Sequence, residues 1–489
     1  MKGQSVGSKI VSSLVWKLME RGGVQIIQFV VSIVIARLLE PAAYGTVALI
    51  TIFVSLATVF VQSGLGLALV QKKDVDSLDF TSVFYFSFIV ATIAYLLLFL
   101  LASPISYFYN LPDLKIILRV MALTLFPGAV NSIQIAVLSK SMKFKLQFYA
   151  SFVSVLFSGL LGIILASSNF GAWALVGQQL SYQVLICIVL WCFVKWRPTL
   201  NFSFSKTKSL LQYGSKILFS NLIDTIYHNL ESLIIGKKYS EMDLAFFSKG
   251  KQFPLILIDN INGSVQSVMF VAYSDAQDDI MRVKSLLRKT ISLSTYIVFP
   301  ATLGLAAISD SLIPIVLGNQ WVECVPFVHV YCLLSMLIPL QTINLQAINA
   351  LGRTDVYFIV IMFKRFIGVA LILCVMLLFD SPISIAYAAL ANELISVLIN
   401  IFPNRNIIGY SPSELLADIL PNLILSAIMA LAVIVFGNLF SILLLRLMCQ
   451  CVLGVAVYIL LSVATKNSDF CYIKSLFFSK ILKNSSGKD

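Results

Sequence analysis

Long apolar stretches alternate with short polar segments along the whole chain. Each stretch contains roughly twenty consecutive residues with few charges, which is the length that a helix needs to cross the hydrocarbon core of a bilayer. An outer-membrane barrel would need short segments of alternating polarity, whereas these stretches are continuous. The pattern therefore indicates an all-α polytopic membrane protein. It predicts about fourteen membrane-spanning helices, near residues 10–36, 44–70, 80–103, 114–138, 148–167, 172–194, 210–235, 243–271, 290–310, 324–350, 356–379, 383–402, 415–436 and 440–464.

Lysine and arginine are concentrated in every second connection between the apolar stretches. The intervening connections carry fewer cations, among them Arg37, Lys115, Lys237 and Lys238. Because cytoplasmic loops carry the excess of basic residues, this asymmetry predicts a protein of the inner (cytoplasmic) membrane with both termini in the cytoplasm. The basic connections contain Lys72, Lys73, Lys140, Lys143, Lys145, Lys195, Arg197, Lys206, Lys208, Arg282, Lys284, Arg288, Lys289, Arg353 and Arg405.

A polar segment over residues 195–208 divides the chain into two halves that begin alike. The first half opens with Gly7-Ser8-Lys9-Ile10, and the second opens with Gly214-Ser215-Lys216-Ile217. Because each half contains an even number of predicted helices, both halves enter the membrane with the same orientation. A parallel repeat of this kind predicts two lobes around a shared cavity. The predicted organisation is a six-helix lobe over 1–200, a second six-helix lobe over 205–405, two additional helices over 410–465 and a cytoplasmic tail over 466–489.

Composition excludes a soluble protein and argues against nucleic-acid binding. The chain is 59% hydrophobic and 12% charged, with a mean hydropathy of +0.93, whereas soluble domains carry roughly 25% charged residues. The net charge of +12 comes mostly from the connections, where the positive-inside rule accounts for it better than a basic binding face does. The eight cysteines lie mostly inside apolar stretches without a paired spacing, so we expect small buried hydrophobic residues, with neither a metal site nor a disulfide.

The sequence offers little support for an enzyme. Asp74-Val75-Asp76 matches a short pattern by which many glycosyltransferases hold a metal and a nucleotide sugar. It lies in a short connection with no domain to bind a nucleotide, so we interpret it as a solvated cap of the third helix. The chain also lacks the Gly-x-x-x-x-Gly-Lys pattern of ATP-binding loops. We therefore expect neither enzymatic activity nor a cofactor.

Six short motifs, in the same order along the chain, resemble those of a known transporter family. The resemblance is to the Wzx-like polysaccharide transporters of the multidrug/oligosaccharidyl-lipid/polysaccharide exporter superfamily. One departure is Ala245-Phe246-Phe247, where the family pattern has a glycine followed by two tyrosines, and this leaves the sugar specificity open. The motifs are Ala36-Arg37-Leu38-Leu39-Glu40-Pro41 with Tyr44-Gly45, Ser63-Gly64-Leu65-Gly66, Ala68-Leu69-Val70-Gln71, Phe246-Phe247-Ser248-Lys249 running to Pro254, Leu317-Gly318-Asn319-Gln320-Trp321, and Ala350-Leu351-Gly352-Arg353-Thr354-Asp355.

The resemblance implies a two-lobe helical fold (MATE/MurJ-like) and a function. A protein of this kind would flip undecaprenyl-diphosphate-linked oligosaccharide across the cytoplasmic membrane by alternating access. The partners would be the lipid-linked oligosaccharide, membrane lipids and a polysaccharide polymerase, and the coupling ion of an antiporter would be H⁺ or Na⁺. Two alternatives stay open: a cation-coupled multidrug exporter of the same superfamily, and, from another class, a membrane glycosyltransferase or ligase. The product, whether O-antigen, capsule or exopolysaccharide, also stays open.

Cationic residues inside the first predicted helix are candidates for contact with the substrate. Lys17 and Arg21 lie roughly 10 and 16 Å from a helix start near residue 10, and Gln28 extends the same face. A diphosphate must cross a layer of low dielectric, and an arginine fork suits its oxygens. We predict that Lys17, Arg21 and Gln28 contact the diphosphate in the cavity. The alternative is a structural cluster in which Glu20 neutralises Arg21.

The equivalent helix of the second half carries acidic residues instead. Asp224 and His228 occupy the repeat positions of Lys17 and Arg21, and Glu231 follows on the same face. Carboxylates and a histidine on one helix face suit proton or sodium coupling. The alternative is an ion pair with a lysine of the other lobe.

Further ionisable residues occur in later helices. Lys364 and Arg365 on the eleventh predicted helix and Glu393 on the twelfth form a secondary candidate set, for which pairing between neighbouring helices and function are both open. Lys249 and Lys251 lie near a helix end, where we expect their side chains to extend to the membrane surface.

Overall fold

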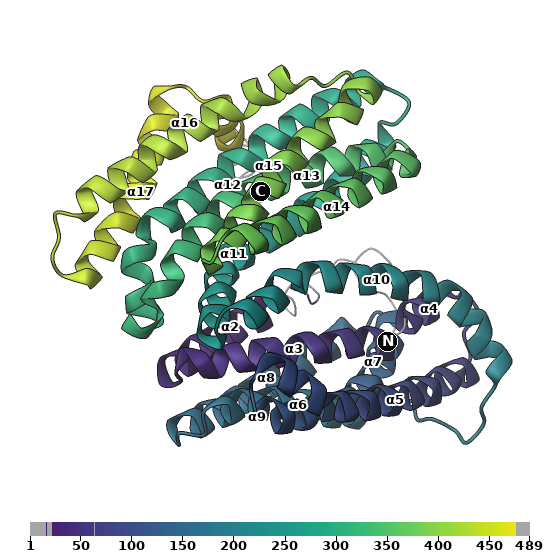
Figure 1. Ribbon diagram of the computed structural model, residues 1–489. Coiled ribbons are helices and arrows are strands. Elements are labelled where there is room, and N and C mark those ends of the chain that lie inside the picture. Colours follow the sequence, from purple (N-terminus) through teal and green to yellow (C-terminus); the bar gives the residue numbers. More distant parts are fainter. Residues whose placement is uncertain (1–15, 17–21, 63, 476–489) are drawn as a thin grey trace, which may run out of the picture. The chain divides into compact units, whose positions relative to one another are not determined.

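The computed structural model describes residue 16 and residues 22–62 and 64–475, and every regular element in these ranges is a helix (Figure 1). The helices form two compact units, Met1–Ala245 and Phe246–Asp489. The all-α polytopic architecture predicted from the alternation of apolar and polar segments is therefore confirmed. Most helix edges agree with the sequence within a few residues, but α5 (Ser77–Tyr109) and α12 (Ile280–Val316) extend well beyond the predicted spans 80–103 and 290–310.

In the first unit α3 lies against α5, α6, α7, α9 and α10. In this unit α10 lies against α3, α4 and α5, and α8 lies against α2 and α9. The helices are α2 (Val24–Leu38), α3 (Pro41–Gln62), α4 (Leu65–Gln71), α5 (Ser77–Tyr109), α6 (Leu114–Met121), the 3₁₀ helix η2 (Ala122–Thr124), α7 (Leu125–Lys140), α8 (Phe144–Ser167), α9 (Ala172–Phe193) and α10 (Phe204–Lys238).

The second unit packs around α12 and α13. Helix α12 lies against α13, α16 and α17, while α13 lies against α15, and α15 lies against α14. The elements are α11 (Glu241–Asp275, of which the part from Phe246 onward belongs to this unit), α12 (Ile280–Val316), the 3₁₀ helix η3 (Asn319–Cys324), α13 (Val325–Ala350), α14 (Thr354–Leu378), α15 (Pro382–Ile407), α16 (Pro412–Gly437) and α17 (Leu443–Ala464).

Among the described residues, eleven candidate spans are long and apolar enough to cross a membrane. Helices α2, α10 and α11 lie where three more spans were predicted, but α2 is described over only 15 residues and α10 and α11 are more polar than the rest. Their polarity makes these two long helices of interest, because charged groups inside a membrane mark functional positions more often than structural ones.

The second predicted span is divided into α3 and α4, a break that the apolar pattern did not predict. Gly64 precedes α4 with a positive φ of 64°, a backbone conformation that side chains disfavour. A Cβ atom there would lie 2.7 Å from the carbonyl oxygen of Gly214 on α10. The glycine of the Ser63-Gly64-Leu65-Gly66 motif therefore permits both the break and the close approach of α10.

A second motif glycine, Gly45 near the start of α3, permits another close approach. A Cβ atom on it would lie 1.7 Å from the carbonyl oxygen of Glu241. The hydroxyl of the neighbouring Thr46 donates to the Glu241 carboxylate at 2.9 Å, and the Tyr44 hydroxyl donates to the Ser32 carbonyl at 3.1 Å. This motif therefore joins the beginnings of α3 and α11.

The predicted linker over residues 195–208 lies against the start of α5, and its last residues belong to α10. The backbone N–H of Ser203 donates to the Ser82 hydroxyl at 3.0 Å. Lys206 forms an ion pair with Asp76, and Asp76 caps α5 by accepting from the Asp79 backbone N–H at 2.8 Å. The hydrogen bond from Lys206 lowers the pKa of Asp76 to about 2. The described contacts of Asp76 are those of a helix cap, in agreement with our interpretation of Asp74-Val75-Asp76.

The boundary between the units falls one helix later than the sequence repeat. The repeat begins a second half at the helix that opens with Gly214, but this helix, α10, packs within the first unit. The predicted lobe limits at 200 and 205 follow the repeat, and packing within each unit does not test them.

Candidate functional site

The face predicted for diphosphate contact lies only partly in the described range. Lys17 and Arg21 lie outside the described residues. Gln28 is on α2, and its side chain is exposed. Exposure leaves the Gln28 amide available to a ligand, but the proposed contact with a diphosphate stays a prediction.

Helix α10 carries the predicted acidic stripe, which we define as Asp224, His228 and Glu231. The helix is continuous over Phe204–Lys238, so the spacing places all three on one face. His228 is exposed and the two carboxylates are half-buried, while the Tyr227 and His228 rings lie 5.9 Å apart. Two carboxylates and an imidazole on one helix face can exchange protons or hold a monovalent cation.

The secondary candidates Lys364 and Glu393 are brought together by a residue that the sequence did not single out. The Lys364 ammonium on α14 donates a hydrogen bond to the side-chain oxygen of Gln341 on α13. The Gln341 amide in turn donates to the backbone carbonyl of Glu393 on α15 at 3.2 Å. Lys364 and Glu393 also interact electrostatically. Three helices are thus joined through one amide.

A pocket of about 190 Å³ lies beside this junction, entirely within the second unit. Gln341 and Glu393 belong to its lining, whereas Arg365 does not. The hydroxyl of Thr342 accepts a hydrogen bond from Asn262 on α11 at 3.1 Å. We call this the α13 pocket, and it is lined by Gln266, Ile338, Gln341, Thr342, Leu345, Gln346, Tyr357 and Glu393.

Most of this lining was not predicted from the sequence, because its residues are neutral and only ionisable residues stand out in apolar helices. A signal was present in the stretch from Gln341 to Gln346, which contains four amide or hydroxyl side chains inside an otherwise apolar helix. Thr342 and Gln346 lie four residues apart and therefore on one helix face, which makes that face of the helix polar. That these residues meet α11, α14 and α15 could not be read from the sequence.

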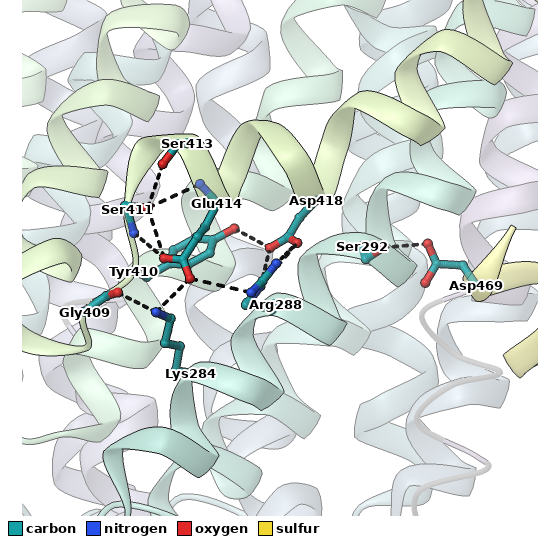
Figure 2. Close-up of polar contacts among 10 residues, drawn as sticks. All are labelled: Lys284, Arg288, Ser292, Gly409, Tyr410, Ser411, Ser413, Glu414, Asp418 and Asp469. Atoms are coloured by element: carbon teal, nitrogen blue, oxygen red, sulfur yellow. Dashed lines mark hydrogen bonds and ion pairs between the residues drawn. The ribbon is translucent and has the colours of Figure 1, made fainter.

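A second polar cluster joins α12 to α16, and Figure 2 shows how its side chains converge from the two helices. Arg288 binds Asp418 through two nitrogens, with Nη2–Oδ1 at 2.7 Å and Nε–Oδ2 at 3.0 Å. Lys284 pairs with Glu414 at 2.8 Å, and the Tyr410 hydroxyl donates to Asp418 at 3.0 Å. We call these five residues the α12–α16 cluster. Each of its described carboxylates has a cationic partner, which is typical of a structural role.

One turn further along α12, polar residues attach the segment that follows α17. The Ser292 hydroxyl donates to the Asp469 carboxylate at 2.6 Å (Figure 2), and the Asn422 amide donates to the same carboxylate at 3.1 Å. Asp469 is only 7% exposed. The α12–α16 cluster and the Ser292–Asp469 hydrogen bond lie on successive turns of α12. Together they join α16 and the segment after α17 to α12.

Two lysines near the start of α11, Lys249 and Lys251, were expected to extend to the membrane surface. The structure contradicts this for Lys249, and for Lys251 it stays a prediction. Lys249 is only 6% exposed and donates to Gln252 at 3.2 Å, so the expectation that it reaches the membrane surface is wrong. Lys251 is half-buried and lies 5.4 Å from the ring centres of both Phe247 and Tyr331. On the same part of α11, Phe246 packs on the fully buried Trp321, and Phe247 packs on Phe327 and Tyr331.

The sequence profile of a family described as "Polysaccharide biosynthesis protein" matches residues 34–326. Among characterised proteins, the chain is similar to the succinoglycan biosynthesis transport protein ExoT of Rhizobium meliloti, with 23% identity over 72% of both chains. It is 24% identical to the teichuronic acid biosynthesis protein TuaB of Bacillus subtilis, over 68% of this chain and 69% of that protein. It is 21% identical to the lipopolysaccharide biosynthesis protein WzxC of Escherichia coli, over 74% of both.

Two solved structures share the fold. The lipid II flippase MurJ in an inward closed conformation superposes with a TM-score of 0.73 and 15% identity, covering 96% of this chain and all of that one. An inward-facing multidrug-resistance MATE transporter superposes with a TM-score of 0.59 and 14% identity, covering 78% of this chain and 96% of that one. At this identity the likeness establishes the fold alone, which is the MATE/MurJ-like fold expected from the sequence motifs.

Proposed function

The chain belongs to the polysaccharide biosynthesis protein family, and on that premise we propose that it flips undecaprenyl-diphosphate-linked oligosaccharide across the cytoplasmic membrane by alternating access. The match over residues 34–326 carries the proposal. Two relatives support it, a succinoglycan biosynthesis transport protein and a lipopolysaccharide biosynthesis protein. The likeness of the fold to that of a lipid II flippase supports it as well. The chain is a multi-pass membrane transporter, not an enzyme.

The chemistry of such a substrate assigns roles to the predicted residues. The diphosphate needs cations inside the membrane, and Lys17 with Arg21 and the Gln28 amide would supply the charge and the hydrogen bonds. The acidic stripe repels an anion, so Asp224, His228 and Glu231 would instead take the coupling ion, H⁺ or Na⁺. A polysaccharide polymerase would receive the flipped substrate on the outer side.

The proposed topology has both termini in the cytoplasm. It follows from the basic connections, and reporter fusions test it. Fusions after Lys145 and after Lys289 should read as cytoplasmic, and a fusion near Gly318 should read as external. A cytoplasmic signal near Gly318 would overturn this topology, because it changes the parity of the helices in the second half.

A substitution series at Arg21 tests the diphosphate contact. Arg21→Ala should abolish flipping of a fluorescent undecaprenyl-diphosphate-linked oligosaccharide in proteoliposomes, and Arg21→Lys should restore it only in part, because a point charge replaces a bidentate fork. The structural alternative is that Arg21 only neutralises Glu20. In that case the double variant Glu20→Gln with Arg21→Gln would flip the substrate normally, since no unpaired charge is left in the membrane, and the proposed contact would be wrong.

A cation-coupled multidrug exporter is the second candidate function, because a MATE transporter shares the fold. The acidic stripe on α10 would serve coupling equally well in either protein. The two candidates differ in the substrate, so a drug-export assay with the same proteoliposomes separates them.

A further inference from the structure

Contacts between helices account for only part of the polar face of α13. Within the stretch Gln341–Gln346, Ile343 and Asn344 are each only 1% exposed and pack away from the α13 pocket. Gln341, Thr342, Leu345 and Gln346 line the pocket. Polar groups inside a membrane protein are costly unless they meet water, protein or a ligand, so this lining requires an occupant that makes hydrogen bonds.

Among the described residues, one carboxylate and no cation line the pocket, which limits the occupant. The carboxylate is that of Glu393, and Lys364 interacts with it electrostatically from outside the lining. The Gln341 side-chain oxygen accepts from Lys364, so it is already occupied by a cation. A metal ion would require several uncompensated oxygens, and a diphosphate would require uncompensated cations. An uncharged ligand fits the balance of charge.

The remaining lining groups both donate and accept hydrogen bonds. Within the described part of the chain, the side chains of Gln266, Gln346 and Tyr357 form no hydrogen bond with another protein group. Two amides and a phenol together offer several donors and several acceptors. A sugar hydroxyl donates and accepts at once, so it matches this mixture. Ile338 and Leu345 add an apolar surface suited to the C–H face of a sugar ring.

The size of the pocket favours one ring over a larger ligand. Its volume of about 190 Å³ lies below the roughly 300–1,000 Å³ of sites that enclose drug-sized ligands. The pocket therefore suits a single monosaccharide unit of a larger ligand.

From the lining, the charge balance and the size, we infer that the α13 pocket binds one uncharged sugar ring of the lipid-linked oligosaccharide. This inference rests on the proposed function and adds a place in the second unit where the sugar is recognised. Gln266 and Gln346 contact the sugar hydroxyls. Lys364 and Glu393 act as positioning residues, because their hydrogen bonds fix the Gln341 amide.

Binding measurements on the full-length protein in lipid nanodiscs test the inference. The probes are undecaprenyl diphosphate without sugar and the same lipid carrying one glucose, galactose or N-acetylglucosamine. At least one sugar-bearing probe should bind more tightly than the bare lipid. Gln266→Leu and Gln346→Leu should each weaken that probe about two- to tenfold, the value of one hydrogen bond, and should leave the affinity for the bare lipid unchanged.

The matched control is Gln179→Leu on α9, a half-buried glutamine in the first unit. It makes the same chemical change away from the pocket and should alter neither affinity. Binding of the bare lipid also reports that each variant is folded. Equal weakening of both kinds of probe by the pocket variants, or no weakening of either, would overturn the sugar subsite.

Two further outcomes separate this inference from the proposed function. If the wild-type protein binds the bare lipid and every sugar-bearing lipid equally, the sugar subsite is wrong and the flippase proposal stands. If it binds none of these lipids, the flippase proposal itself fails. A gain of affinity in sodium chloride over choline chloride that the pocket variants abolish would identify a cation site instead, and would also overturn the inference.

Discussion

The acidic stripe on α10 and the α13 pocket are two polar regions in apolar helices, and they are built differently. The stripe lies on one helix, where Asp224, His228 and Glu231 recur at helical spacing. The pocket takes its residues from α11, α13, α14 and α15, far apart in the sequence. The stripe has two carboxylates, whereas the single carboxylate of the pocket, Glu393, interacts with Lys364. The comparison teaches that carboxylates grouped on one helix suit a mobile cation, whereas amides and hydroxyls gathered from several helices suit a neutral ligand.

The two regions also differ in what a substitution should disturb. The stripe residues Asp224, His228 and Glu231 lie on a single helix, α10. Lys364 and Glu393, in contrast, compensate each other across α14 and α15, with the Gln341 amide between them. Changes in the pocket should therefore affect stability first, and changes in the stripe should affect coupling first.

The largest effect is expected when the charge balance of the pocket is broken. Lys364→Met or Glu393→Gln alone should lower the free energy of unfolding by about 2 kcal/mol, less than the cost of leaving a fully buried charge without its partner, because both side chains are half-buried. The double variant should recover most of this loss, because no uncompensated charge is left. Thermal unfolding of purified protein in detergent measures both quantities. Additive losses in the double variant would show that the two residues do not compensate each other.

A smaller loss of stability is expected in the α12–α16 cluster, which serves as a structural control for both regions. Arg288→Ala removes the bidentate contact with Asp418 and should cost about 1–2 kcal/mol, since Arg288 is partly exposed and hydrogen bonds to charged groups contribute about this much. Unfolding measurements give the loss. The dependence of transport on an ion gradient should stay as in the wild type, and a changed ion dependence would assign the cluster a role in coupling.

In the acidic stripe we expect a transport defect with little loss of stability. Asp224→Asn or Glu231→Gln keeps the shape and some hydrogen bonding but removes the charge that a cation would follow. Transport driven by a proton or sodium gradient should slow, while the free energy of unfolding changes by less than about 1 kcal/mol. Flux assays with and without the gradient test this. Unchanged gradient-driven flux in both variants would make the stripe structural.

The smallest effect is expected at the surface pair Asp76–Lys206. The pKa of Asp76 is lowered to about 2 by the hydrogen bond from Lys206, so the stabilisation is complete above the ordinary pKa near 3.8 and is lost as the pH falls toward 2. The melting temperatures of wild type and Lys206→Gln should therefore differ slightly at pH 6 and converge at lower pH. A difference that grows as the pH falls would contradict the assignment of this pair.

Much of the fold could be predicted from the sequence because membrane-spanning helices leave a strong local signal. The length of the apolar stretches located the helices. The stretch over residues 210–235 was also predicted as a helix, although it contains several charged residues. The break at Gly64 could not be predicted from hydropathy, because it depends on the left-handed backbone of one residue and on the approach of Gly214 from a distant helix. The burial of Lys249 was missed for a similar reason, since it is decided by packing against neighbours and not by the position of the residue near a helix end.

The candidate sites were predictable only where one helix carries them. The spacing of Asp224, His228 and Glu231 identifies their shared face from the sequence alone. The meeting of Lys364 with Gln341 depends on the packing of α13 against α14 and α15, and a single sequence carries no direct signal for that. The polar run Gln341–Gln346 was visible, but its neutral side chains gave no reason to prefer a binding site over helix packing.

The most direct test of the central claim is a competition between two substrates in one set of proteoliposomes. Purified wild-type protein would be supplied with fluorescent undecaprenyl-diphosphate-linked oligosaccharide and with a cationic dye that multidrug exporters transport, under an imposed proton or sodium gradient. We predict that the lipid-linked oligosaccharide is flipped, that the dye is not exported, and that Arg21→Ala abolishes the flipping. Export of the dye without flipping of the lipid would contradict the flippase proposal and would identify the chain as a multidrug exporter.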